Sequence, residues 1–194
     1  MSLPGSPVLP VMAADLSTTH FELFGLPQSF EVDTAQLDSR YRELQRAVHP
    51  DRFASASDQE RRISMQQATQ INEGYQLLKD PLQRGRYLLE LDGYHFDDEH
   101  NTTSDAAFLM EQMELRELLG EVREADNAFA ALGRIMDRID ADADALVDVL
   151  RRLFAGAGPD ASGQIADAIT KMQFFRKLQQ EALELEVTIE DEIS

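Results

Sequence analysis

The sequence predicts an all-α protein, and three observations support this prediction. Apolar residues recur every three or four positions along almost the whole chain, which is the period of amphipathic helices. No stretch alternates apolar and polar residues for long, as a half-exposed strand would. Glycine and proline are few, at 10 and 7 of 194 residues, and several of them lie where one periodic segment gives way to the next. We therefore expect helices joined by turns.

The first half of the chain is expected to form four helices. Asp33 and Ser57 are each suited to cap a helix, and Glu60, three residues after Ser57, completes the pattern of a capping box. Pro50 ends the second helix, and the fourth begins at Pro81, because proline fits the first turn of a helix. The expected helices cover residues 21–25, 33–49, 57–80 and 81–91.

The second of these helices has an apolar stripe on one face and basic residues on the other. The stripe follows helical spacing and consists of Leu37, Tyr41, Leu44 and Val48. Winding at about 100° per residue places Arg42 and Arg46 roughly opposite that stripe. We therefore expect a basic surface facing solvent just before the turn His49-Pro50-Asp51.

The second half is expected to form an antiparallel bundle of three longer helices. Residues 97–104 are a polar segment that separates it from the first half, and residues 156–159 give the clearest break between two of its helices. The helices are expected at 104–125, 127–155 and 160–187. The middle helix keeps one apolar seam, formed by Phe129, Leu132, Ile135, Ile139, Leu146, Leu150 and Leu153. Amphipathic helices joined by short turns bury such seams against one another.

These segments predict two folded domains with flexible parts around them. The first domain is expected at 18–93 and the second at 104–188, joined by a linker at 94–103. Flexible tails are expected at 1–17, where prolines interrupt the chain, and at the acidic residues 189–194.

Charge and composition narrow the class of partner. The net charge is −18, of which residues 93–194 carry −14, so nucleic acid and anionic membranes should be repelled. Cysteine is absent, which excludes thiolate metal sites and thiol nucleophiles, and the run Asp140–Asp144 lacks the glycine and final glutamate of a calcium loop. We therefore expect a protein partner, with no metal, cofactor, nucleic acid or membrane.

No apolar run is long enough to cross a bilayer and no basic leader is visible, so the bacterial cytoplasm is expected rather than the mitochondrial matrix.

Four motifs occur in the order and spacing of a known family. They are Tyr41-Arg42-Glu43-Leu44 followed by Arg46, His49-Pro50-Asp51-Arg52-Phe53, Ile71-Asn72-Glu73-Gly74-Tyr75, and Asp80-Pro81 with Arg84 and Tyr87. Together they resemble the J-domain family, whose second helix and His-Pro-Asp turn dock on a DnaK-type chaperone and trigger ATP hydrolysis there. The resemblance implies that role for Arg42, Arg46, His49, Pro50, Asp51 and Arg52. Val48 departs from the pattern, because a tyrosine often precedes the histidine.

The second half extends the resemblance to a narrower group. No glycine-rich or zinc-binding region follows the first domain, and the stretch Phe108–Leu118 resembles the C-terminal domain of HscB-type J-domain co-chaperones of iron–sulfur cluster biogenesis. The resemblance covers about residues 19–187. It implies a J-domain of four helices, including an antiparallel hairpin, followed by a three-helix domain that binds the iron–sulfur scaffold protein.

Helical winding separately predicts a binding surface on the first helix of the second domain. The core stripe there consists of Phe108, Leu115, Leu119 and Val122. Met110 and Met113 project about 150° away from it, beside Leu109. The expected client-binding set is completed by Glu114, Glu117 and Glu121 in the same outer region and by Phe174, which falls off the apolar face of the last helix. The alternative is that these residues pack loosely against a neighbouring helix.

The expected function is that of a co-chaperone without enzymatic activity of its own. The resemblance implies that it stimulates the ATPase of a specialised HscA-like chaperone and delivers an IscU-like scaffold protein to it, which assists cluster transfer and maturation of iron–sulfur proteins. Three alternatives remain open at this point. They are a general J-domain co-chaperone for other clients, an acidic adaptor whose J-like turn no longer signals, and an enzyme that turns over without a chaperone.

Overall fold

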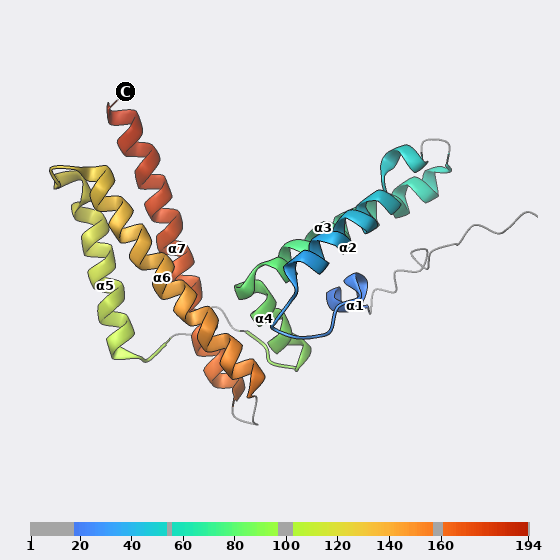
Figure 1. Ribbon diagram of the computed structural model, residues 1–194, viewed down its shortest axis with the longest axis horizontal. Coiled ribbons are helices and arrows are strands. Elements are labelled where there is room, and N and C mark those ends of the chain that lie inside the picture. The colour runs from blue at the N-terminus through green and yellow to red at the C-terminus, as the bar shows by residue number, and fades with distance from the viewer. Residues whose placement is uncertain (1–17, 54–55, 97–102, 157–160, 194) are drawn as a thin grey trace, which may run out of the picture. The chain divides into compact units, whose positions relative to one another are not determined.

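The computed structural model describes residues 18–53, 56–96, 103–156 and 161–193, and all regular structure in these ranges is helical (Figure 1). The all-α prediction is confirmed. The helices are α1 (His20–Phe24), α2 (Thr34–Ala47), the 3-10 helix η2 (Pro50–Phe53), α3 (Asp58–Lys79), α4 (Pro81–Leu91), α5 (Ala106–Glu121), the 3-10 helix η3 (Val122–Glu124), α6 (Ala128–Ala155) and α7 (Ala161–Ile193). No helix in the described part of the chain is long and apolar enough to span a membrane.

The chain divides into two compact units. Unit 1 comprises Met1–Gln28 and Val32–Asp80, and unit 2 comprises Ser29–Glu31 and Pro81–Ser194. The expected tail at 1–17 and most of the expected linker lie outside the described residues. The domain limits drawn from the sequence therefore stay a prediction.

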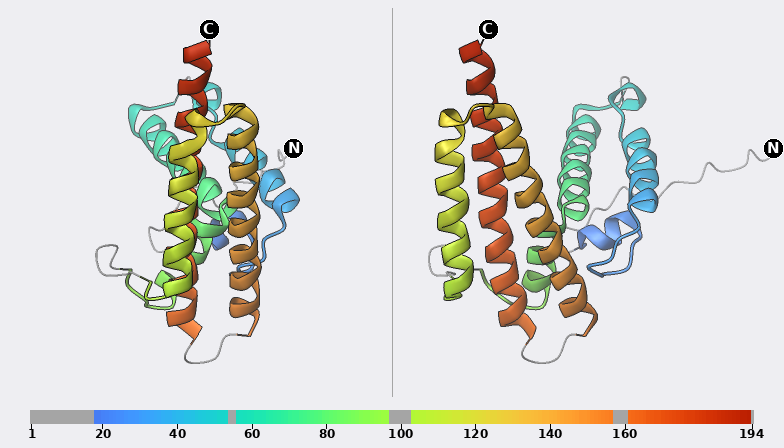
Figure 2. Two further views of the ribbon diagram at one scale, coloured as in Figure 1. Left: turned by 90° about the vertical axis from the view of Figure 1, so that its left-hand side faces the viewer. Right: turned by 60° about the vertical axis from the view of Figure 1, so that its left-hand side comes forward.

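Unit 1 is built on an antiparallel hairpin of α2 and α3, with α1 packed against α3 (Figures 1 and 2). The expected caps are present: Asp33 accepts a hydrogen bond from the N–H of Gln36 at 3.0 Å, and Ser57 and Glu60 form a capping box. Its fully buried side chains are Phe21, Phe24, Leu37, Ile71 and Leu78. These apolar faces hold the two long helices together and fix the turn that joins them.

Two members of the expected stripe on α2 are only half-buried. Tyr41 stacks on Tyr75 with ring centroids 4.1 Å apart, and its hydroxyl donates to Asn72 at 2.9 Å. The hydroxyl of Tyr75 donates to Asp38 at 2.8 Å. Leu44 is also half-buried. The tyrosine rings cover the apolar interface while their hydroxyls remain at its polar edge.

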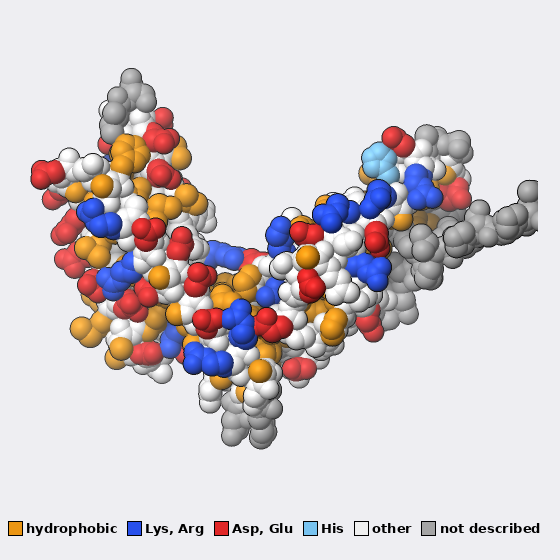
Figure 3. Space-filling model, in the orientation of Figure 1, with side chains coloured by type: hydrophobic (Ala, Val, Ile, Leu, Met, Phe, Trp, Pro, Cys, Tyr) orange, Lys and Arg blue, Asp and Glu red, His pale blue; other side chains and the backbone are white. Residues whose placement is uncertain are grey.

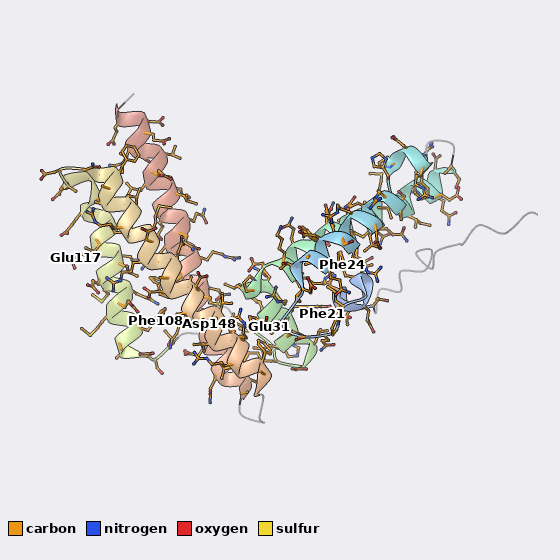
Figure 4. All side chains as sticks on the ribbon, viewed as in Figure 1. Phe21, Phe24, Glu31, Phe108, Glu117 and Asp148 are labelled. Atoms are coloured by element: carbon orange, nitrogen blue, oxygen red, sulfur yellow. The ribbon has the colours of Figure 1, made fainter. Side chains whose placement is uncertain are left out.

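Unit 2 is a bundle in which α6 and α7 pair along their length and α5 packs beside them (Figure 2). The bundle core consists of Phe108, Leu115, Leu119, Val122, Leu132, Ile135, Ile139, Phe175, Leu178, Ala182 and Ile189. Arg151 of α6 pairs with Asp148 one turn earlier and with Glu31 (Figure 4). The expected three-helix arrangement is therefore present.

Helix α4 packs on α6 and α7, whereas the sequence grouped it with the preceding helices. The packing is close at Gly85, where a Cβ atom would be in van der Waals contact with the Phe30 ring at 3.4 Å and with Ile169 at 3.5 Å. The Phe30 ring stacks on that of Phe154 with the ring centroids 5.0 Å apart. The backbone carbonyl of Phe30 accepts a hydrogen bond from Nε of Arg84 at 2.7 Å. These contacts join α4 to segments distant in the sequence, and the apolar periodicity of α4 itself does not reveal them.

Two expectations for the bundle differ from the structure. Phe129 was expected in the seam of α6 but is 40% exposed, because it lies in the first turn of that helix. Helix α7 continues to Ile193, through residues expected to form a flexible tail. Ile189 is 3% exposed and belongs to the bundle core, which explains why the helix persists.

Candidate chaperone- and client-binding surfaces

The His49-Pro50-Asp51 turn is held in place from its first residue. The Val48 side chain is 2% exposed, and its carbonyl accepts from the hydroxyl of Ser64 on α3 at 2.9 Å. The chain then bends into η2, where the N–H of Asp51 donates to Nδ1 of His49 at 3.3 Å. His49, Pro50 and Asp51 are all exposed. The turn therefore presents two polar side chains and a proline to solvent from an anchored base.

A basic face on α2 leads to this turn. Arg42 and Arg46 are exposed, and Nε of Arg46 donates to the carbonyl of Arg42 at 3.1 Å. Among the described residues, no carboxylate forms an ion pair with Arg42, Arg46 or the exposed Arg52 of η2. Lys and Arg side chains follow α2 towards a histidine beside η2 (Figure 3). The structure thus places all six residues of the expected chaperone-binding set in one solvent-facing region.

Helix α5 exposes a group of apolar side chains that we call the methionine patch, consisting of Leu109, Met110 and Met113. Met110 and Met113 are each 73% exposed and Leu109 is 43% exposed. The opposite face of the same helix is buried in the bundle core through Phe108, Leu115 and Leu119. The patch is therefore displayed on a helix that packing holds in position.

The start of α5 is fixed by charge as well as by packing. Asp105 caps the helix by accepting from the N–H groups of Ala107 at 3.1 Å and Phe108 at 3.2 Å. Lys171 of α7 donates to Asp105 at 2.8 Å and pairs with Asp167 at 2.9 Å. Desolvation tends to lower the pKa of Lys171, but hydrogen bonds to these two carboxylates outweigh it and raise the pKa. The first turn of α5, which leads into the patch, is thereby tied to α7.

Carboxylates border the methionine patch as expected. Glu114, Glu117 and Glu121 are exposed. Glu117 lies on the outer side of α5, whereas Phe108 lies on the side that faces the bundle (Figure 4). Glu114 is engaged, because Arg138 of α6 donates to it at 3.1 Å. The patch is therefore apolar at its centre and acidic at its edge.

Phe174 lies at the boundary between core and surface. Its ring meets those of Phe108 and Phe175 edge to face, with centroids 5.7 Å apart in both pairs. The guanidinium of Arg116 covers it at 5.2 Å from the ring centroid. Phe174 is half-buried, so the expectation that it falls off the apolar face of α7 holds for only part of the ring.

Sequence reasoning missed Arg138 of α6 and Lys171 of α7, whose side chains pair with carboxylates of α5 and of its N-cap. In the sequence both residues fit the polar, solvent-facing side of their helices. Only the packing of the helices brings their carboxylate partners within reach. In the described part of the chain, no group of three or more His, Asp or Glu residues is placed to hold a metal ion.

Comparison with known proteins agrees with this geometry. Residues 104–183 match the family model described as the HSCB C-terminal oligomerisation domain. The co-chaperone HscB homolog of Shewanella oneidensis is 41% identical over 172 residues, which is 89% of this chain and 99% of the relative. The homolog of Ralstonia nicotianae is 44% identical over 168 residues, which is 87% of this chain and 94% of the relative.

Two solved structures are similar over most of the chain. Chaperone HscB from Vibrio cholerae has a TM-score of 0.77 and 41% identity, covering 88% of this chain and 99% of that one. The human co-chaperone HscB has a TM-score of 0.81 and 31% identity, covering 95% of each chain.

The helical hairpin with its exposed His-Pro-Asp turn, followed by a separate helical bundle, defines a J-domain co-chaperone. The chain belongs to the HscB co-chaperone family. The resemblance inferred from the motifs is thereby confirmed, as is the all-α fold with an N-terminal J-domain and a C-terminal helical domain.

Proposed function

We propose that this protein stimulates ATP hydrolysis by a specialised, HscA-like DnaK-type chaperone and delivers an IscU-like iron–sulfur cluster scaffold protein to it. The observation that carries the proposal is the exposure of Met110 and Met113 on an anchored, acid-rimmed helix, in a chain that also exposes a His-Pro-Asp turn. Cluster transfer from the scaffold and maturation of iron–sulfur proteins would follow. The bacterial cytoplasm is the proposed location.

The chaperone contact is proposed to be mainly electrostatic. Arg42, Arg46 and Arg52 have no carboxylate partner among the described residues, so their charge is available to an acidic surface. Complementary charge accelerates encounter and selects orientation more than it adds affinity. The anchored turn of His49 to Asp51 then fixes the register of docking. ATP hydrolysis takes place on the chaperone, and this chain supplies no catalytic group.

The client contact is proposed to be mainly apolar. Burying a methionine side chain that was exposed contributes about 1.5–3 kcal/mol, and the unbranched side chain adapts to the surface it meets. Glu114, Glu117 and Glu121 at the edge favour a partner with basic groups around an apolar centre. Phe174 would contribute the exposed part of its ring.

Carrying both contacts on one chain has a kinetic consequence. A client bound to the methionine patch is kept at high effective concentration near the chaperone engaged by the J-domain. Hydrolysis and client capture then coincide more often than they would by separate encounters. The scaffold and this protein together should therefore stimulate the ATPase more than the sum of their separate effects.

The test is steady-state ATP hydrolysis by the cognate chaperone, measured with and without this protein, with and without the scaffold. Each mixture is repeated with His49→Gln and with the control His95→Gln, which changes an exposed histidine outside the turn. Synergy that His49→Gln abolishes and His95→Gln keeps supports the proposal. Stimulation that is indifferent to the scaffold indicates a general J-domain co-chaperone. No stimulation in any mixture refutes the proposal and leaves the adaptor alternative.

A further inference from the structure

A groove lies between α5 and α6 in the half of the bundle near Asp105. It encloses about 900 Å³ and is lined by residues of α5, α6 and α7. Its apolar walls are formed by Ala107, Phe108, Met110, Ala145, Leu146, Val149 and Phe175. Both helices belong to the same bundle (Figure 2), and Arg138 of α6 faces Glu111 and Glu114 of α5 across the groove.

The charges around this groove do not balance. Arg138 faces three carboxylates, with its nitrogens 3.4 Å from Glu111, 3.1 Å from Glu114 and 3.9 Å from Asp142. The other cation in the lining, Lys171, is already shared between Asp105 and Asp167 and cannot serve them. One guanidinium therefore offsets three negative charges, and the groove retains an excess of negative charge.

Asp142 is the least satisfied of the three carboxylates. Its side chain is 34% exposed, but its Oδ2 atom is buried, accepts no hydrogen bond from the described residues and has Nε of Arg138 only at 3.9 Å. A carboxylate oxygen taken from water without a donor is costly, and a cationic donor would offset that cost most effectively. An anion would be repelled by the same groups, and an apolar side chain would leave the oxygen without a donor.

The groove is continuous with the methionine patch. Met110 and Glu114 belong to both surfaces, since each lines the groove and lies in the patch or at its edge. A partner that covers the patch would therefore reach the mouth of the groove without leaving α5.

We propose that the groove receives a lysine or arginine side chain of the client that binds the methionine patch. The aliphatic part of the side chain lies against Leu146 and Val149, and its charged end reaches the carboxylates of Asp142 and Glu111. Lysine and arginine suit such a site because their long stems are apolar and only their ends are charged. This inference rests on the proposed function and adds a charge-selective contact to an otherwise apolar interface.

The test is titration calorimetry of the isolated scaffold protein with the full chain, at low and high salt. Asp142→Asn keeps the shape and removes the charge, and we expect it to weaken binding about tenfold, which is the effect of losing one charge-assisted contact. The matched control is Asp144→Asn, an exposed residue of the same helix that does not line the groove. The difference between the two variants should shrink at high salt, and Asp142→Glu should recover most of the affinity.

A second pair of variants tests the shape of the groove. Ala145→Phe should fill it and weaken binding by at least as much as Asp142→Asn, whereas Ala141→Phe places the same ring on an exposed part of α6 outside the groove. Thermal unfolding of each variant separates a lost contact from a misfolded bundle.

The possible results separate the two proposals. If the wild-type chain does not bind the scaffold, the proposed function is refuted. Wild-type binding that Asp142→Asn and Ala145→Phe leave unchanged, in variants that unfold as wild type does, refutes only the groove. Two further results contradict a charge-selective contact. In one, Asp142→Asn loses binding and Asp142→Glu does not recover it. In the other, the loss in Asp142→Asn is as large at high salt as at low salt.

Discussion

The two surfaces of this protein differ in what they expose and in how they are held. The turn in unit 1 exposes charges and a proline, and it is held by the buried Val48 side chain and by the hydrogen bond that the Ser64 hydroxyl donates to the Val48 carbonyl. The methionine patch in unit 2 exposes large apolar side chains on a helix whose opposite face is core. Under the proposed function, the chaperone would be recognised through charge and shape, which favours fast exchange, and the client through apolar burial, which favours retention.

The largest effect should come from placing charge in the methionine patch. Met110→Glu combined with Met113→Glu removes two apolar contacts and introduces charge where the partner is apolar. At about 1.5–3 kcal/mol for each buried methionine, client affinity should fall at least about a hundredfold, measured by titration calorimetry. Stimulation of the chaperone in the absence of client should not change.

Met65→Glu is the control for the patch, because Met65 is 68% exposed on α3 of the other unit. It introduces the same residue at an equally exposed methionine and should leave client affinity intact. If the patch variant binds the client as wild type does, the proposal that the client binds the methionine patch of unit 2 is wrong.

A smaller effect is expected from reversing the charge of the basic face. Arg42→Glu with Arg46→Glu should reduce stimulation of the chaperone about ten- to a hundredfold at low salt, because steering reverses sign. The loss should diminish as salt is added, since screening weakens both attraction and repulsion. Client affinity should be unaffected, in contrast to the patch variant.

Arg134→Glu with Arg152→Glu makes the same change of charge on α6 of unit 2. In the assay without client it should stimulate as wild type does. Equal losses in both double variants would indicate that total charge, rather than the face on α2, attracts the chaperone.

Packing within unit 1 should tolerate less change than packing at an open helix position. A Cβ atom at Gly74 would lie 2.7 Å from Nδ1 of His20 and 3.1 Å from the ring of Phe24. Gly74→Ala should therefore lower the free energy of unfolding by about 1–2 kcal/mol, since overpacking exceeds the gain in helix propensity. Amide hydrogen exchange should locate the loss of stability in α1 and α3. The client affinity of the variant should be unchanged.

Gly133→Ala is the matched control in unit 2, because nothing lies within 4 Å of a Cβ atom there. It should raise the free energy of unfolding by up to about 1 kcal/mol through helix propensity alone. Destabilisation by both variants would mean that the close contact at Gly74 is not the cause.

Local features of this protein could be predicted from the sequence, because they depend on neighbouring residues. The caps at Asp33 and Ser57, the exposure of the turn and the exposure of Met110 and Met113 follow from spacing of three or four residues. The same spacing separates the buried face of α5 from its patch. The candidate sites can therefore be predicted without tertiary contacts.

Features that depend on packing between distant segments could not be predicted in this way. Gly85 of α4 packs near Ile169 of α7, Ile189 extends α7 beyond its expected end, and Arg138 pairs with carboxylates on another helix. Each of these residues has an ordinary pattern in its own helix. The groove between α5 and α6 belongs to the same class, because no periodicity describes the space between two helices.

The smallest effect concerns the pH dependence of the patch-bearing helix. The hydrogen bond from Lys171, followed by those from the N–H groups of Phe108 and Ala107, lowers the pKa of Asp105 below its model-compound value of 3.8. A carboxyl whose pKa is lower in the folded than in the unfolded chain contributes stability above the unfolded value, and this is lost as the pH falls through the folded value. Lys171→Met removes the largest cause of the lowering.

The variant should therefore be less stable than wild type at neutral pH, and the difference should narrow as the pH falls below 3.8. Urea unfolding at a series of pH values measures this, and Lys177→Met, an exposed lysine of the same helix, is the control. A constant difference at all pH values would mean that Lys171 acts through its packing on Phe108, whose ring centroid lies 5.4 Å from Nζ, rather than through Asp105. A difference that narrows only for Lys171→Met would show that Lys171 stabilises the fold through its charge and its pairs with Asp105 and Asp167.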